Sequence, residues 1–235
     1  MRLLRPAASR GRTRTDWLDS RHAFSFGDYH DPQWLGFGPL RVLNEDRVAP
    51  GAGFPPHNHA NMEILTWVLD GALEHRDSTG GGGTIRPGEL QRMSAGHGIE
   101  HSEYNASAGA AVHFLQLWLQ PDRLNTPPGY AQRAFAPQAL AGRWCLLAAP
   151  RDMADAAGAV GLRQDARLYA ARLAAGQAVG HALAAGRRAW LQVARGEVRC
   201  DDLDLGAGDG LGVSGVDGLR IQARGEAEVI LLDLP

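Results

Sequence analysis

Apolar and polar residues alternate along this chain in short stretches that end at turns. The stretch 40–48, "LRVLNEDRV", precedes the turn "APGAG", and 62–69, "MEILTWVL", precedes the turn residues Asp70 and Gly71. The clearest alternation is 111–121, "AVHFLQLWLQP", which puts histidine and three leucines on one face. An alternation with a period of two predicts β-strands rather than helices.

The same pattern returns in the second half of the chain. Short strands are predicted at "RWCLLAAP", "RLYAARL", "RRAWLQVARGEVRC", "GLRIQA" and "EVILLDLP", and short helices at "APQALAG" and "RDMADAAGAV". The proline-rich segment 122–135, "DRLNTPPGYAQRAF", is interpreted as a linker between the halves. Many short strands joined by glycine-rich turns are typical of β-sandwiches and barrels. We therefore predict an all-β chain with two β units related as a divergent repeat.

Composition narrows the class of protein. The chain has 235 residues, 44% of them hydrophobic, and a net charge of −2, which supports a packed core and argues against direct nucleic-acid or membrane binding. The arginine-rich residues 2–14 are interpreted as a poorly ordered leader. Cys145 and Cys200 are expected to be free, buried thiols. Because no apolar run is long enough to span a membrane, we predict a cytoplasmic protein.

Two pairs of polar residues have a spacing suited to metal binding. His57 and His59 are two positions apart, and His101 and Glu103 repeat that spacing downstream. Residues i and i+2 of a strand point to the same face, so two adjacent strands can direct four side chains at one ion. Three imidazoles and one carboxylate suit a divalent transition metal. The alternative is an exposed polar turn that contains histidine, but the recurrence of the pair favours a metal site.

Both pairs lie in longer motifs that resemble those of the cupin superfamily. Gly51 to Glu63, followed by Gly71, resembles the first cupin motif, and Gly88 to Asn105 resembles the second. The strings "DWLDSRHAFSFGDY", "LRVLNEDRVAPGAGFPPHNH", "MEILTWVLDGALEHRDS", "QRMSAGHGIEHSEYN" and "VHFLQLWLQP" are similar to pirin and the bacterial pirin-like proteins with quercetin 2,3-dioxygenase activity.

The resemblance implies a bicupin, with two jelly-roll-like β-barrels or sandwiches facing each other. Residues 1–125 would form the cupin with the metal site, and residues 126–235 a degenerate cupin without metal. The ligands of the family fall on four residues of this chain: His57, His59, His101 and Glu103. Glu103 would also be the catalytic base.

The motifs depart from the general cupin pattern at two places. The interval from Glu63 to Gly71 is one residue longer, and Ser94 stands where proline is usual. In many cupins the glutamate equivalent to Glu63 binds the metal, whereas the resemblance to pirins favours Glu103.

The resemblance implies a metal-dependent dioxygenase that cleaves flavonols such as quercetin and releases carbon monoxide. The partners would be a flat aromatic substrate and dioxygen, and the ion iron, with nickel, copper, cobalt, manganese or zinc also compatible with the donors. Candidate pocket walls include Met62, Leu65, Met93, Phe114 and Trp118. The alternative is a metal-binding, redox-sensing regulator that acts through a protein partner without turnover; another cupin enzyme is a third reading. A monomer is the default expectation.

The other histidines are interpreted structurally. We expect His97 in a tight turn, His75 at a solvated strand end, and His22 and His30 in packing contacts. His113 is predicted to be a core histidine or, alternatively, to support the ligands from behind. His181 alone cannot form a metal site in the second half.

Overall fold

The computed structural model describes residues 1–235, which fold into two compact units. The first unit is Gly11–Ala134, and the second unit combines Met1–Arg10 with Phe135–Pro235. Strands predominate in both, so the predicted all-β class is confirmed. None of the helices combines the length and hydrophobicity required to cross a membrane.

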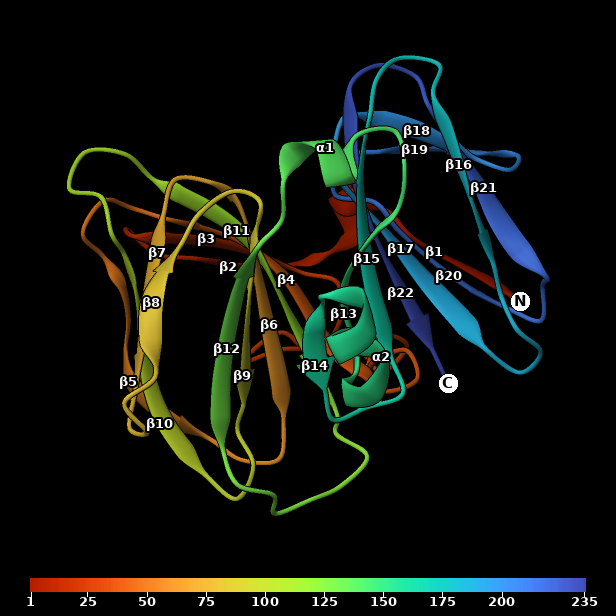
Figure 1. The fold of residues 1–235 in the computed structure, drawn as a ribbon. Coiled ribbons are helices and arrows are strands. Elements are labelled where there is room, and N and C mark those ends of the chain that lie inside the picture. Colours follow the sequence, from red (N-terminus) through yellow and green to blue (C-terminus); the bar gives the residue numbers. More distant parts are fainter. The chain divides into compact units, whose positions relative to one another are not determined.

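Two antiparallel sheets build the first unit (Figure 1). The larger has the order β12-β9-β6-β11-β4-β3-β2, and its strands are β2 (Gly11–Arg14), β3 (Leu18–His22), β4 (Leu40–Val48), β6 (Glu63–Asp70), β9 (Glu89–Ser94), β11 (Val112–Leu119) and β12 (Gly129–Ala134). The smaller has the order β5-β10-β7-β8, with β5 (Gly53–His59), β7 (Leu73–Asp77), β8 (Gly82–Ile85) and β10 (Ile99–Asn105).

Apolar side chains from both sheets of the first unit pack against one another. Val68 on β6 and Phe114 on β11 belong to the same buried cluster as Leu73 on β7 and Ile85 on β8. A second cluster joins Ile64 and Met93 of the large sheet to Ile99 of the small one. The two sheets therefore pack face to face, as expected for a β-sandwich.

The edge strand β5 departs from an ordinary strand in composition. It contains Pro55 and Pro56, which an edge tolerates because the outer side of the strand needs no ladder donors. Gly53 begins the strand opposite Tyr104, and a side chain at this position would collide with the backbone of β10. These residues let β5 lie closely against β10.

The second unit repeats the pattern of one large and one small sheet. The large sheet, β1-β20-β17-β22-β15-β13-β14, consists of β1 (Arg2–Arg5), β13 (Cys145–Pro150), β14 (Val160–Leu162), β15 (Arg167–Leu173), β17 (Arg188–Arg195), β20 (Gly210–Ser214) and β22 (Ala227–Leu234). The small sheet, β16-β21-β18-β19, consists of β16 (Ala178–Ala182), β18 (Glu197–Cys200), β19 (Leu203–Gly206) and β21 (Gly218–Ala223). A core cluster of buried apolar residues lies within this unit.

The structure changes the interpretation of two segments that were predicted to be irregular. The arginine-rich start is not a disordered leader, because β1 pairs with β20 over Arg2–Arg5 and a 3-10 turn, η1 (Ala7–Ser9), follows it. The segment interpreted as a linker contains β12, which pairs with β9 at the sheet edge. The two short helices are confirmed as α1 (Pro137–Leu140) and α2 (Arg151–Ala157).

Candidate metal centre

The pairing of β5 with β10 positions the predicted ligands. His57 lies directly opposite His101 in the antiparallel register, and His59 lies opposite Ile99. A bulge follows, so that Glu103 is opposite Phe54. On its other side β10 pairs with β7, where Asp77 faces His101 and His75 faces Glu103. The three neighbouring strands β5, β10 and β7 thus bring several polar side chains together.

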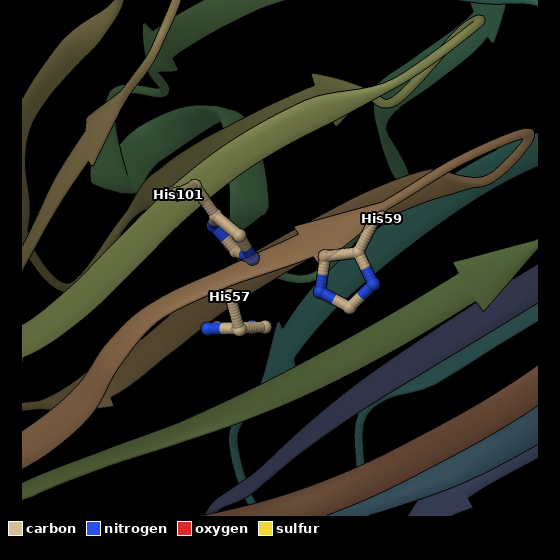
Figure 2. Close-up of side chains that lie close together, drawn as sticks. All are labelled: His57, His59 and His101. Atoms are coloured by element: carbon tan, nitrogen blue, oxygen red, sulfur yellow. The ribbon is translucent and has the colours of Figure 1, made fainter.

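His57, His59 and His101, from β5 and β10 of the small sheet, form a histidine cluster, and Figure 2 shows their side chains close together. Their ring centroids are 4.8 Å apart for His57 and His59, 4.4 Å for His57 and His101, and 4.9 Å for His59 and His101. One nitrogen from each ring lies within 4.8 Å of the other two. Imidazole nitrogens converging at this distance can bind a single ion.

Each ring of the cluster has a nitrogen available for such an ion. The Nδ1–H of His57 donates to the carbonyl oxygen of Pro55 at 2.8 Å, which leaves Nε2 as the free lone pair. The Nε2 atoms of His59 and His101 are buried and have no hydrogen-bond partner. An unpaired buried polar atom costs about 1–3 kcal/mol, so these atoms fit a site built for a ligand.

Burial also keeps the cluster in the protonation state that metals require. It lowers the pKa of His59 to about 4, with a smaller contribution from the charge of His57. It lowers the pKa of His101 to about 2, helped by His57, His59 and His75. Both rings are therefore neutral at neutral pH, and neutral imidazole is the metal-binding form.

Glu103 lies beside the cluster and has one unpaired oxygen. Its Oε2 accepts a hydrogen bond from Nε2 of Gln116 at 2.8 Å, whereas the buried Oε1 has no partner. Burial raises the pKa of Glu103 to about 7. A ligand atom of Glu103 lies within 4.8 Å of one from His101 and one from His75. His101 is thus common to two groups of possible ligands.

The environment of His75 differs from the sequence interpretation. It was expected at a solvated strand end, but its side chain is fully buried beside that of Asp77. The ring stacks on Tyr130 at 5.0 Å and lies 5.1 Å from the ring of His101. The signal was present in the sequence, since Leu73, His75 and Asp77 alternate with more exposed residues and therefore share the inner face.

A pocket of about 300 Å³ opens beside the histidine cluster. Such a volume is at the lower end of the range for small-molecule sites. Of the five predicted wall residues only Trp118 lines it, because Leu65, Met93 and Phe114 are buried in the core and Met62 packs, partly buried, against a core cluster. The lining is Thr13, Leu18, Ser20, His22, Phe26, Asn44, Asp46, Phe54, Pro55, His57, His59, Glu103, Gln116 and Trp118.

Two pocket residues, His22 and Phe26, come from the N-terminal part of the first unit, and His22 was expected in a packing contact. His22 is buried and hydrogen-bonded to Asn44 at 2.8 Å and to Thr13 at 2.9 Å. Phe26 contacts Trp118 edge-to-face at 5.4 Å, and Trp118 contacts His59 in the same way at 4.8 Å. Aromatic rings therefore extend from the cluster across the pocket.

The remaining candidates lie outside the cluster. His113 is a buried histidine hydrogen-bonded to Glu45 at 2.9 Å, which confirms the core interpretation. His97 is exposed between two glycines, and His30 is also exposed, so its expected packing contact is wrong. Glu63 is buried on β6 and belongs to neither group of possible ligands. In the second unit His181 pairs with Asp233 at 3.0 Å.

Comparison with known proteins identifies the family. A family model described as pirin matches residues 4–119, and one described as the quercetinase C-terminal cupin domain matches residues 146–234. The chain is 42% identical over 232 residues to quercetin 2,3-dioxygenase of Escherichia coli K12, covering 99% of this chain and 98% of the relative. The chain belongs to the pirin family. It is also 39% identical over 217 residues to a pirin-like protein of Caulobacter vibrioides, covering 92% of each.

Solved pirin structures share the whole fold. The nickel(II) complex of the bacterial pirin YhhW from Escherichia coli has a TM-score of 0.93 and 42% identity, and the match covers 100% of this chain and 99% of that one. A second YhhW structure has a TM-score of 0.94 and 41% identity over 100% and 98% of the chains. The predicted bicupin fold is therefore confirmed, and together with the histidine cluster the nickel complex supports a divalent-metal site in this pirin.

Proposed function

We propose that this pirin is a metal-dependent dioxygenase that cleaves the central ring of flavonols such as quercetin and releases carbon monoxide. The observation that carries the proposal is the histidine cluster, two of whose members, His57 and His59, line a pocket with aromatic walls. Full-length similarity to a relative named quercetin 2,3-dioxygenase supports the choice of substrate class.

In this proposal His57, His59, His101 and Glu103 hold one divalent transition-metal ion. The fit rests on the donor set, since three imidazoles each have a nitrogen available and Glu103 has a free oxygen. When bound, such an ion lowers the pKa of a coordinated hydroxyl and orients both reactants. Iron is the resident ion that we propose, and the nickel complex of a relative supports a site that also accepts nickel.

Glu103 is the group that we propose accepts the proton of the flavonol 3-hydroxyl. A general base works best when its pKa is close to the working pH, and burial brings the pKa of Glu103 to about 7. Its orientation is fixed by a chain of two hydrogen bonds. The indole N–H of Trp118 donates to Oε1 of Gln116 at 3.0 Å, which directs the amide N–H of Gln116 toward Glu103.

The pocket walls orient a flat substrate and keep water away from it. Phe26, Phe54 and Trp118 offer aromatic surface, against which flavonol rings can stack or pack edge-to-face. Asp46 lines the same pocket and has a buried oxygen without a partner, which suits it to accept a hydrogen bond from a substrate hydroxyl. The aromatic side chains would thus contact the faces of the substrate, and Asp46 would bind a hydroxyl at its edge.

The cytoplasm is the location that we propose. Cys145 and Cys200 are both free, which agrees with a reducing compartment. A monomer that binds a small aromatic substrate and dioxygen is sufficient for the proposed reaction.

The direct test is the consumption of quercetin in air by apoprotein reconstituted with one metal at a time. The absorbance of quercetin should fall with the reconstituted wild type and not with His57→Ala. Equal rates for the wild type, the variant and free metal ions would reject an enzymatic reaction at this site.

A further inference from the structure

His75 connects the candidate ligand His101 to a carboxylate. The Nδ1 atoms of His75 and His101 are 3.4 Å apart, and Nε2 of His75 is 3.2 Å from Oδ2 of Asp77. The side chains of His75 and Asp77 are fully buried. The three residues therefore form a hydrogen-bonded chain that water does not interrupt.

The two oxygens of Asp77 have different partners. Oδ1 accepts hydrogen bonds from the backbone N–H of Thr79 at 2.9 Å, from the hydroxyl of Thr79 at 2.6 Å and from the backbone N–H of Gly81 at 3.0 Å. A side chain at Gly81 would press against the carboxylate, so glycine permits this close approach. The turn from Asp77 to Gly81 thus anchors Asp77 with Oδ2 toward His75.

These contacts determine which nitrogen of each ring carries a proton. A carboxylate only accepts, so the proton of His75 is on Nε2 and its Nδ1 is a lone pair. The contact between the two Nδ1 atoms then requires the proton of His101 to be on Nδ1. The lone pair of His101 is consequently on Nε2, the buried atom without a partner.

We propose that Asp77 and His75 are positioning residues that hold His101 in the tautomer and ring orientation needed to bind the metal through Nε2. Buried hydrogen-bond partners behind a ligating histidine fix its ring and increase its basicity. This inference rests on the proposed metal site and adds to it two residues outside the four ligands. His75 acts as an acceptor from His101 and does not itself contact the ion.

The wild-type protein provides a test that needs no variant. A long-range proton–nitrogen correlation spectrum distinguishes the two tautomers of each imidazole. In the apoprotein we expect the proton of His101 on Nδ1 and that of His75 on Nε2, and in the zinc-loaded protein we expect the metal-induced shift on Nε2 of His101. A proton on Nε2 of apo His101, or metal bound to Nδ1 of His75, would overturn the proposal.

Asp77→Asn reverses the direction of the hydrogen bonds that link residue 77, His75 and His101, with almost no change in the shape of the side chain. The three donors around Oδ1 will retain the amide oxygen there, which turns the amide N–H₂ toward Nε2 of His75. His75 must then carry its proton on Nδ1, and the proton of His101 moves to Nε2. We expect nickel affinity, measured by competition with a colorimetric chelator, to fall about tenfold to a hundredfold.

Tyr130→Phe is the matched control, because it retains the ring stacked on His75 and removes only a hydroxyl that bonds to Gln132. Its nickel affinity should stay within about twofold of the wild type, with circular dichroism verifying the fold of both variants. Wild-type nickel affinity in folded Asp77→Asn would overturn the positioning role. A wild type that binds no nickel would instead reject the proposed metal function, and the tautomers of the apoprotein would still decide the inference.

Discussion

His57 on β5 and His101 on β10 lie directly opposite each other in an antiparallel pair, with ring centroids 4.4 Å apart. Their convergence is set by backbone register rather than by flexible side chains. A one-residue slip of β5 would turn both of its histidines to the other face of the sheet. The histidine cluster is therefore preorganised by the same hydrogen bonds that build the small sheet.

Metal content should depend on this cluster and not on the histidine of the second unit. We expect His101→Ala to lose most of the bound metal, because it removes a nitrogen that is central to both groups of possible ligands. His181→Ala is the control, since His181 pairs with Asp233. The measurement is the metal-to-protein ratio after reconstitution and desalting, and equal ratios in the two variants would reject the ligand assignment.

The working carboxylate can be identified by two isosteric changes. Glu103→Gln should lower flavonol turnover by about a hundredfold or more, because an amide cannot accept the substrate proton. Glu63→Gln should have a much smaller effect, since Glu63 does not line the pocket. Initial rates at saturating quercetin would give the order of the two losses. The reverse order would make Glu63 the working carboxylate.

Phe26 should affect substrate binding more than chemistry. Phe26→Ala removes an aromatic wall that contacts Trp118 but none of the proposed ligands. We expect KM for quercetin to rise roughly twofold to tenfold with little change in kcat. Leu35→Ala is the matched control in the same segment, because Leu35 is 54% exposed and lies outside the pocket. Equal KM values in the two variants would mean that the substrate does not contact this wall.

The buried thiol of Cys200 should make stability depend on alkaline pH. Burial, and then the charge of Asp201, raises its pKa from 9.0 to about 12. The unfolded chain loses this proton near its lower pKa, so the free energy of unfolding falls between these two values, by about 1 kcal/mol per pH unit. At pH values below the pKa of the thiol in the unfolded chain, the contribution of Cys200 to stability is fully present.

Cys200→Ala removes the thiol and should reduce the fall of the free energy of unfolding with rising pH. Denaturant unfolding of the wild type and the variant across the same pH range compares them directly. Parallel curves would show that the Cys200 thiol is not protected in the folded chain.

Much of the fold and the four proposed ligands could be predicted because their signals are local. The alternation over 40–48 became β4 with the expected bounds, and the alternation over 111–121 became β11. The spacing of His57 and His59 places both on one face of a strand. The motif around His101 needs only its own glycine turns to be recognised.

The parts that were missed depend on contacts between distant segments. β1 forms a strand only because it pairs with β20, which lies near the other end of the chain. His75 is surrounded by charged residues in the sequence, and its burial follows from the pairing of β7 with β10 and the stacking of Tyr130 on its ring. Likewise, Phe26 follows β3 in the chain yet contacts Trp118 on β11, and β3 and β11 flank the same strand, β4.

The most direct measurement is the stoichiometry of the proposed reaction. Metal-reconstituted wild type would be supplied with quercetin and isotope-labelled dioxygen, while dissolved oxygen, carbon monoxide and the ring-opened product are quantified. For the wild type we expect one carbon monoxide released for each dioxygen consumed, and both labelled oxygen atoms in the product. For His57→Ala we expect no carbon monoxide and no labelled product. Tight metal binding with no carbon monoxide under any ion would contradict the dioxygenase and favour a metal-binding regulator that acts without turnover.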